Sequence, residues 1–185
     1  SFLTEVEINT TDRSGMAEAI EAAQSADVVI MVLGEHGFMS GEARSRTDLG
    51  LPGLQQELLE KVYANNPKIV LVLNNGRPLA LPWAAERIPA IVEAWQLGSQ
   101  AGHAIAQALY GDHNPEGRLP MTFPRNVGQV PIHYDHFSTG RPTPPNDIFW
   151  THYIDAPNTP LYPFGYGLSY TTFAYDGLSG AASEA

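Results

Sequence analysis

The chain has 185 residues, which is the length of one ordinary domain of about 100 to 200 residues. Hydrophobic residues make up 43% of the sequence and charged residues 16%, a balance that favours a buried core over intrinsic disorder. The 20 acidic and 10 basic side chains give a formal charge of -10, which repels phosphate backbones and anionic lipids, so we expect no nucleic-acid and no membrane partner.

Features that are absent from the sequence exclude further kinds of site and of protein. It contains no cysteine, which excludes disulfides, a thiolate nucleophile and thiolate metal ligands. No stretch reaches the roughly 18 consecutive apolar residues of a membrane span. Residues 1–10 lack the basic and long apolar regions of a signal peptide, so any export signal is expected upstream of Ser1 or not at all.

Helical and strand patterns alternate along the first half of the chain. Apolar residues at Met16, Ile20 and Ala23 recur at helical spacing and predict a helix over 15–25. The uninterrupted apolar run 28–33 is rich in β-branched residues and predicts a strand covered on both faces, as in a parallel sheet.

The alternation continues toward the middle of the chain. Pro52 suits the first position of a helix that is expected to end at Asn65. The elements expected after it are a buried strand over 69–73, a short helix over 82–87, a weaker strand over 90–95 interrupted by Glu93, and a helix over 102–110. This order predicts an α/β fold, a layered α/β/α sandwich around a largely parallel sheet.

The composition of the sequence changes from Asn114 onward. Prolines, glycines and aromatic residues follow without a sustained period, so we expect irregular, packed chain over 124–170. Its aromatic residues are expected to brace this chain, with stacking on sugar faces as the alternative; they are Phe149, Trp150, Tyr153, Tyr162, Phe164, Tyr166 and Tyr170. We therefore predict one domain over 1–176 with a long irregular C-terminal region, followed by a frayed tail over 177–185.

Polar residues cluster where the predicted strands end, which is where ligands gather in open α/β sheets. The loop after the first strand is the richest and carries Glu35, His36, Glu42, Arg44, Arg46 and Asp48. A general acid is one interpretation of this loop. A solvated loop with weak surface ion pairs is the other.

Several segments of the sequence, in order, resemble glycoside hydrolase family 3, and most closely the second domain of its bacterial periplasmic β-glucosidases. The likeness runs from about residue 15 to 175. It rests on Gly34-Glu35, residues 41–48, Leu51-Pro52, residues 74–78, residues 109–124 and residues 162–173. The resemblance implies a six-stranded α/β sandwich that follows a TIM-like barrel, with the first strand of the sandwich upstream of Ser1.

The resemblance also implies a division of the catalytic groups. Retaining glycosidases use two carboxyl groups about 5 to 5.5 Å apart. The family's nucleophilic aspartate belongs to the barrel, whereas Glu42 matches the general acid/base. The barrel would supply the burial and negative charge that raise the pKa of an acid. Arg44 and Arg46 are expected to bind substrate hydroxyls or to orient Glu42, with a solvated ion pair as the alternative.

Glu35 is the competing candidate for the acid, but its place directly after a strand favours a structural role. We expect it to accept backbone N–H groups or to pair with an arginine. The implied function is the acid/base domain of a retaining β-glucosidase-like exo-hydrolase that acts on β-linked oligosaccharides or glucosides. It requires no cofactor and no metal, is periplasmic or secreted, and is inactive without its barrel.

Two other functions remain open at this point. One is a non-catalytic carbohydrate-binding or interaction module of the same fold. The other is a flavodoxin-like nucleotide binder, suggested by the turn at Gly98–Gly102, although the sequence lacks a phosphate-binding glycine motif there.

Overall fold

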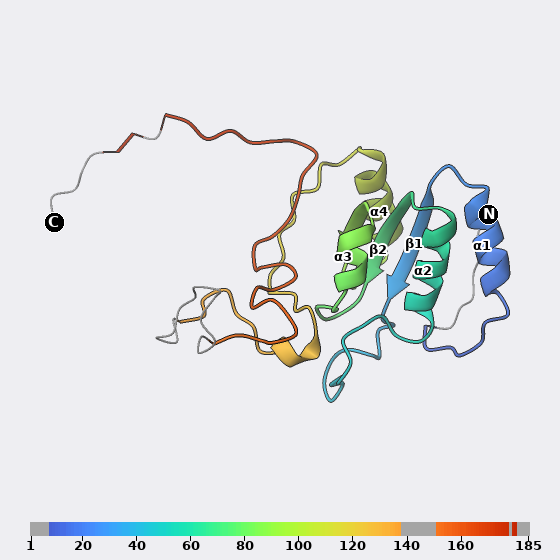
Figure 1. Ribbon diagram of the computed structural model, residues 1–185. Helices are drawn as coiled ribbons and strands as arrows, with labels where there is room; N and C mark the ends of the chain where they lie inside the picture. The colour runs from blue at the N-terminus through green and yellow to red at the C-terminus, as the bar shows by residue number, and fades with distance from the viewer. Residues whose placement is uncertain (1–7, 138–150, 178, 181–185) are drawn as a thin grey trace.

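A three-stranded parallel sheet forms the centre of the chain, in a computed structural model that describes residues 8–137, 151–177 and 179–180. The strands are β1 (Val29–Gly34), β2 (Ile69–Asn74) and β3 (Ala90–Glu93), in the order β1-β2-β3. Val29 lies opposite Ile69, and Val70 lies opposite Ala90. The predicted parallel sheet is confirmed (Figure 1).

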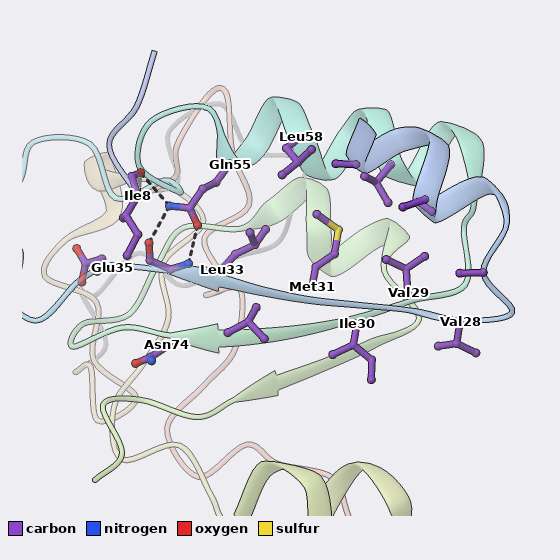
Figure 2. Close-up of a pocket in the computed structure, with 17 residues that line it drawn as sticks. Ile8, Val28, Val29, Ile30, Met31, Leu33, Glu35, Gln55, Leu58 and Asn74 are labelled. Atoms are coloured by element: carbon purple, nitrogen blue, oxygen red, sulfur yellow. Dashed lines mark hydrogen bonds between the residues drawn. The ribbon is translucent and has the colours of Figure 1, made fainter. Parts of the chain in front are cut away.

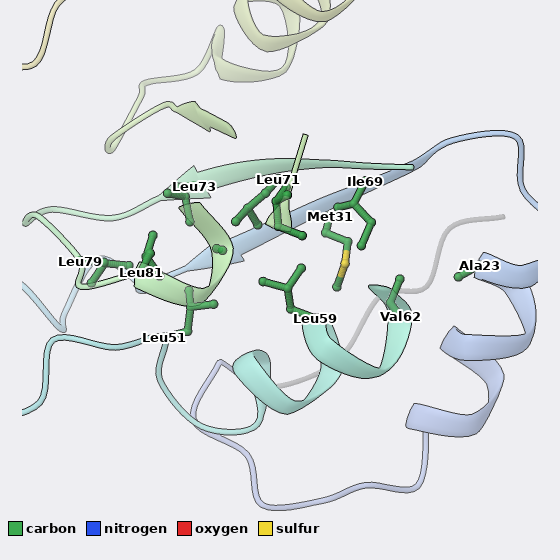
Figure 3. Packing of buried hydrophobic residues seen from close by; sticks show 12 residues of the cluster. Ala23, Met31, Leu51, Leu59, Val62, Ile69, Leu71, Leu73, Leu79 and Leu81 are labelled. Atoms are coloured by element: carbon green, nitrogen blue, oxygen red, sulfur yellow. The ribbon is translucent and has the colours of Figure 1, made fainter. Parts of the chain in front are cut away.

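Helices lie on both sides of this sheet. Helices α1 (Met16–Gln24), α2 (Gln55–Asn65) and α3 (Pro82–Arg87) share one core with the sheet, while α4 (Ala101–Tyr110) lies beyond its other face (Figures 2 and 3). The layered α/β/α arrangement is therefore present. α4 has no buried residue. In the described part of the chain, no helix is long and apolar enough to cross a membrane.

The hydrophobic core lies between the sheet and the helices α1 to α3 (Figure 3). Leu59 and Val62 of α2 point at Ile69 and Leu71 of β2, and Leu59 and Leu71 are both fully buried. Burial of a leucine side chain stabilises a fold by about 1.5 to 3 kcal/mol. These contacts fix the central strand, and with it the positions of the loops at its end.

Two element boundaries differ from the prediction by more than one residue, and in both cases the backbone explains why. α2 begins at Gln55 rather than at Pro52, because Gly53 has a φ of 61° and turns the chain first. A Cβ atom at Gly53 would lie 2.7 Å from the Ile8 carbonyl oxygen. β3 ends at Glu93 rather than at Trp95, because Trp95 has a left-handed φ of 54°.

The C-terminal region is largely irregular, as predicted, and is held by a short antiparallel pairing. The Phe123 N–H donates to the Tyr162 carbonyl (2.8 Å), and the Leu119 N–H donates to the Tyr166 carbonyl (2.8 Å). Ring contacts run from Trp95 through Phe123 and Tyr162 to Tyr166. Aromatic bracing is thus confirmed for part of the predicted cluster. Phe149 and Trp150 lie outside the described residues, as do residues 178 and 181–185 of the predicted tail.

A groove of about 570 Å³ runs along the edge of β1 that faces away from β2 (Figure 2). Its walls include residues of α1 and α2. Val28, Ile30 and Val32 are 47% to 60% exposed, so the prediction that this strand is covered on both faces is wrong: within the described residues one face packs on the core and the other stays open. At the end of the strand, the side-chain amide of Gln55 accepts from the Gly34 N–H (2.7 Å) and donates to the Gly34 carbonyl (2.8 Å). Gln55 therefore closes this edge at its last residue.

Candidate active site

The loop between β1 and α2 projects past the carboxyl ends of the strands (Figure 1). Gly34 ends β1 with a φ of 137°, and a Cβ atom there would lie 2.1 Å from the Asn74 carbonyl oxygen. Glycine is therefore required where the chain leaves the sheet. The loop carries all the residues that the sequence singled out as catalytic or substrate-binding.

Glu35 anchors the base of this loop. Its side chain is fully buried, and its carboxylate contacts two guanidinium groups: Arg46 Nη1 at 2.8 Å and Arg77 Nε at 3.0 Å. The Gly76 N–H donates to the same carboxylate at 3.4 Å. Burial of a carboxylate requires such pairing. The structural role that the sequence favoured for Glu35 is confirmed.

Arg77 reaches from the loop after β2 into the loop after β1. Its Nη2 donates to the Arg44 carbonyl at 2.7 Å and also to the Met39 carbonyl. Its side chain is 18% exposed. One guanidinium group therefore binds the Glu35 carboxylate and two backbone carbonyls of the projecting loop.

The loops after β2 and β3 contact the same loop through Ser40. A Cβ atom at Gly76 would lie 1.9 Å from the Ser40 Oγ, so only glycine fits at this approach. Gln96 Nε2, from the loop after β3, donates to the Ser40 Oγ at 3.4 Å. The three strand ends thus meet around the base of the loop.

Glu42 lies at the exposed tip of the loop. It follows Gly41, with a φ of 125°, and precedes Ala43, with a left-handed φ of 58°. The Arg44 N–H donates to the Gly41 carbonyl at 3.3 Å and closes the turn. Within the described residues the Glu42 carboxylate has no hydrogen bond and no ion pair, so it is open to a partner outside this chain.

The other predicted residues occupy different positions around the loop. The Arg46 guanidinium points inward, to Glu35 and to the Gly50 carbonyl (3.0 Å), with 16% of its side chain exposed. Arg44 is exposed and contributes its carbonyl to Arg77. Asp48 accepts from the Gly50 N–H at 2.8 Å and shapes the turn that follows.

A second carboxyl group, Glu93, lies at the end of β3. It accepts from the Trp95 N–H (3.0 Å) and from Asn75 Nδ2 (3.3 Å), and burial raises its pKa to about 7. The amide oxygen of Asn75 is buried without a hydrogen-bond partner in the described structure. The only sign of this group in the sequence is a glutamate that interrupts a predicted apolar strand.

In the sequence, Arg77 stands out only as part of the segment 74–78. Its position in the loop after a predicted strand is the one signal that points to it. What the sequence alone does not reveal is the direction of its side chain, which crosses to the neighbouring loop. Among the described residues there is also no group of three or more histidine, aspartate or glutamate side chains that could hold a metal ion.

Comparison with known families gives this geometry a context. Residues 1–170 match the glycosyl hydrolase family 3 C-terminal domain, and the chain belongs to this family. It is 51% identical over 158 residues to the periplasmic β-glucosidase of Salmonella typhimurium, covering 84% of this chain and 21% of that protein. It is 43% identical over 173 residues to a β-xylosidase of Formosa agariphila, covering 91% and 23%.

Solved structures agree with the sequence comparison. A β-glucosidase from Listeria innocua superposes with a TM-score of 0.84 at 40% identity, over 89% of this chain and 23% of that one. The same protein is known in complex with glucose, at the same TM-score. The chain therefore spans about one fifth of the length of these relatives. The family and the α/β fold class expected from the resemblance are confirmed. The sheet of the described residues has three strands, however, and not the six that the resemblance implied.

Proposed function

We propose that this domain supplies the general acid/base, Glu42, of a retaining glycoside hydrolase whose nucleophile comes from a barrel domain. The observation that carries the proposal is the contrast within one loop. Its base is fixed by Glu35, Arg46 and Arg77, while the carboxylate at its tip has no partner in the described chain. A fixed loop with a free carboxylate suits a group that must meet a substrate.

The chemistry requires one carboxyl group to act twice. Glu42 would first protonate the glycosidic oxygen as the nucleophile attacks the anomeric carbon, which forms a covalent glycosyl-enzyme. The resulting Glu42 carboxylate would then take a proton from the water that hydrolyses this intermediate. No cofactor or metal ion takes part in these steps.

A general acid also needs an environment that keeps it protonated near neutral pH. Glu42 is exposed in this chain. Docking of the barrel would bury it and place the nucleophilic carboxylate nearby, and both effects raise the pKa of a carboxyl group. This dependence is why we expect the 185 residues to be inactive alone.

Arg44 and Arg46 are proposed to act near the substrate in different ways. The exposed side chain of Arg44 can reach a sugar hydroxyl directly. Arg46 is engaged with Glu35 and the Gly50 carbonyl, so its contribution would be to orient the loop.

The named relatives include β-glucosidases and a β-xylosidase, so we propose a terminal β-linked glucoside as the substrate and test a xyloside beside it.

The test compares the domain alone with the multidomain protein in which it is joined to its barrel. We expect no hydrolysis of an aryl β-glucoside by the 185 residues, activity in the joined protein, and loss of that activity in Glu42→Gln. Asp48→Asn, at the other end of the same loop, is the matched control and should stay active. Robust hydrolysis by the 185 residues, or an active Glu42→Gln enzyme, would overturn the proposal.

The same preparation separates this function from a binding module. Calorimetric titration of the 185 residues with glucose and cellobiose should give no heat of binding if the barrel supplies most sugar contacts. Tight binding by the domain alone would instead support a carbohydrate-binding module. The periplasmic location named for the Salmonella typhimurium relative extends to this protein as part of the proposal.

A further inference from the structure

We propose that Arg77 is a positioning residue for Glu42, and that it acts through the loop backbone rather than by touching the substrate. This inference rests on the proposed role of Glu42. It concerns a residue on a different loop, one that follows β2 and lies outside the segment that carries the acid.

The first argument is the placement of the two carbonyls that Arg77 binds. Met39 precedes the tip residue Glu42 and Arg44 follows it, and both carbonyls accept from the same Nη2 atom. The two sides of the turn are therefore tied to one point. A change in the position of that guanidinium group moves both sides of the tip together.

The second argument is that the guanidinium group is itself fixed. Its Nε lies 3.0 Å from the buried carboxylate of Glu35, which directly follows β1. Pairing of a planar guanidinium with a carboxylate sets orientation as well as distance. The position of the tip is therefore set by the ends of two neighbouring strands, β1 and β2.

The third argument is that nothing else in the described chain directs the Glu42 side chain. Glu42 has no side-chain partner there, so its direction follows from the backbone turn between Gly41 and Ala43. Misplacement of a catalytic group by about 1 Å can cost on the order of a hundredfold in rate. Loss of the carbonyl contacts of Arg77 should therefore affect proton transfer in particular.

The variant that isolates this role is Arg77→Lys. Lysine keeps the positive charge that Glu35 needs, but a single ammonium group cannot bind Glu35 and both carbonyls in the same fixed geometry. The matched control is Arg125→Lys. Arg125 also binds two backbone carbonyls, those of Thr159 (3.0 Å) and Pro160 (3.1 Å), but it lies in the C-terminal region away from the loop.

The first measurement is kcat/KM in the multidomain protein for two β-glucosides with different leaving groups. Phenolate leaves slowly without a proton from the acid, whereas 2,4-dinitrophenolate leaves readily without one. We expect Arg77→Lys to lower kcat/KM for the phenyl glucoside about 10- to 100-fold, with less than about a threefold change for the dinitrophenyl glucoside. Glu42→Gln should show the same selectivity more strongly, and Arg125→Lys should show none.

The second measurement is amide hydrogen exchange in the 185 residues themselves. In Arg77→Lys we expect exchange of the Arg44 amide, which closes the turn at the tip, to speed up about tenfold or more relative to the unchanged chain. Arg125→Lys should leave this amide unaffected. This readout does not depend on activity.

The outcomes distinguish the two claims. If Glu42→Gln shows no selectivity between leaving groups, the proposed function is wrong and the positioning role falls with it. If Glu42→Gln is selective while Arg77→Lys lowers kcat/KM equally for both substrates, or leaves the Arg44 amide unchanged, the positioning role alone is overturned.

Discussion

At the scale of single residues, buried charge is concentrated at the ends of the strands. Glu35 pairs with two arginines and is fully buried, while Glu93 is largely buried and binds only neutral groups. The two carboxyl groups should therefore respond to substitution in opposite ways. The ionised form of Glu35 is stabilised by its two arginine partners, whereas the ionised form of Glu93 is destabilised by burial.

For Glu35, removal of the charge should weaken the fold. We expect Glu35→Gln to lower the free energy of unfolding by about 3 kcal/mol, because two largely buried guanidinium groups lose their counter-ion. Urea denaturation of the 185 residues measures this. The control is Glu57→Gln on α2, where the pairs with Arg13 and Lys61 are exposed and little change is expected. Equal effects of the two variants would contradict the buried pairing.

For Glu93, the pH dependence of stability should reveal the buried acid. Burial raises its pKa from 4.5 to about 7, so the folded state binds the proton more tightly than the unfolded state. Its contribution to stability is fully present below pH 4.5 and is lost as the pH rises through 7. Unfolding free energies measured from pH 4.5 to 8 should fall with pH by up to about 3 kcal/mol more in the unchanged chain than in Glu93→Gln.

A carboxyl group with a lowered pKa affects the stability of the fold over a different pH range. Hydrogen bonds from Arg13 and Lys61 lower the pKa of Glu57 to about 2, but solvent screens these exposed pairs, so the contribution of Glu57 to stability is small. That contribution is present above pH 4.5 and is lost as the pH falls toward 2. The Glu93 experiment therefore avoids this range. Parallel pH profiles for the unchanged chain and Glu93→Gln would show that burial does not perturb this group.

At the scale of elements, the exposed face of β1 is the main feature that the sequence did not reveal. The apolar run 28–33 predicted a strand covered on both faces, and the strand is present as β1, but Ile30 and Val32 are exposed on the face opposite Met31. A local apolar pattern reports what a strand can bury. It does not predict which segments pack on that strand in the fold, because those segments are distant in the sequence.

We propose that a further strand from outside the described chain pairs with β1, as the resemblance implied. The Val29 N–H donates to the carbonyl of Lys68, just before β2, and the Glu35 N–H donates to the carbonyl of Asn74 in β2. The alternating N–H groups of Ile30 and Val32 therefore face the open edge. In the 185 residues these two amides should exchange at least a hundredfold faster than those of Met31 and Leu33. In the multidomain protein they should become protected, and unchanged fast exchange there would rule out the added strand.

At the scale of the whole molecule, the sequence predicted the order of helices and strands and part of the aromatic packing of the C-terminal region, but not the polar contacts that also hold it. Its irregular character followed from the prolines and glycines between 114 and 170. The contacts that hold it are made by single polar side chains over long separations in sequence. Gln129, for example, accepts from the Arg125 N–H (2.7 Å) and donates to the Pro157 carbonyl (2.8 Å). No periodic pattern encodes such a contact.

Gln129 provides a test of that arrangement. It is 1% exposed, so Gln129→Ala leaves buried backbone groups without partners and should lower the free energy of unfolding by about 1 to 3 kcal/mol. Limited proteolysis should then cut faster near Pro157. Gln107→Ala, on the exposed surface of α4, is the matched control and should leave both readouts unchanged. If cleavage near Pro157 is equal in both variants, Gln129 does not hold this segment.

The amide of Gln55 bears on how the sheet can grow. It occupies the outward N–H and carbonyl of Gly34 with the two hydrogen bonds that a neighbouring strand would otherwise make. A strand added beside β1 therefore cannot pair with Gly34. Whatever chain pairs with β1 must turn away before it reaches the rim where Glu35 begins. The loop that carries Glu42 therefore stays clear of added backbone, and the sheet can gain a strand beside β1 without covering that loop.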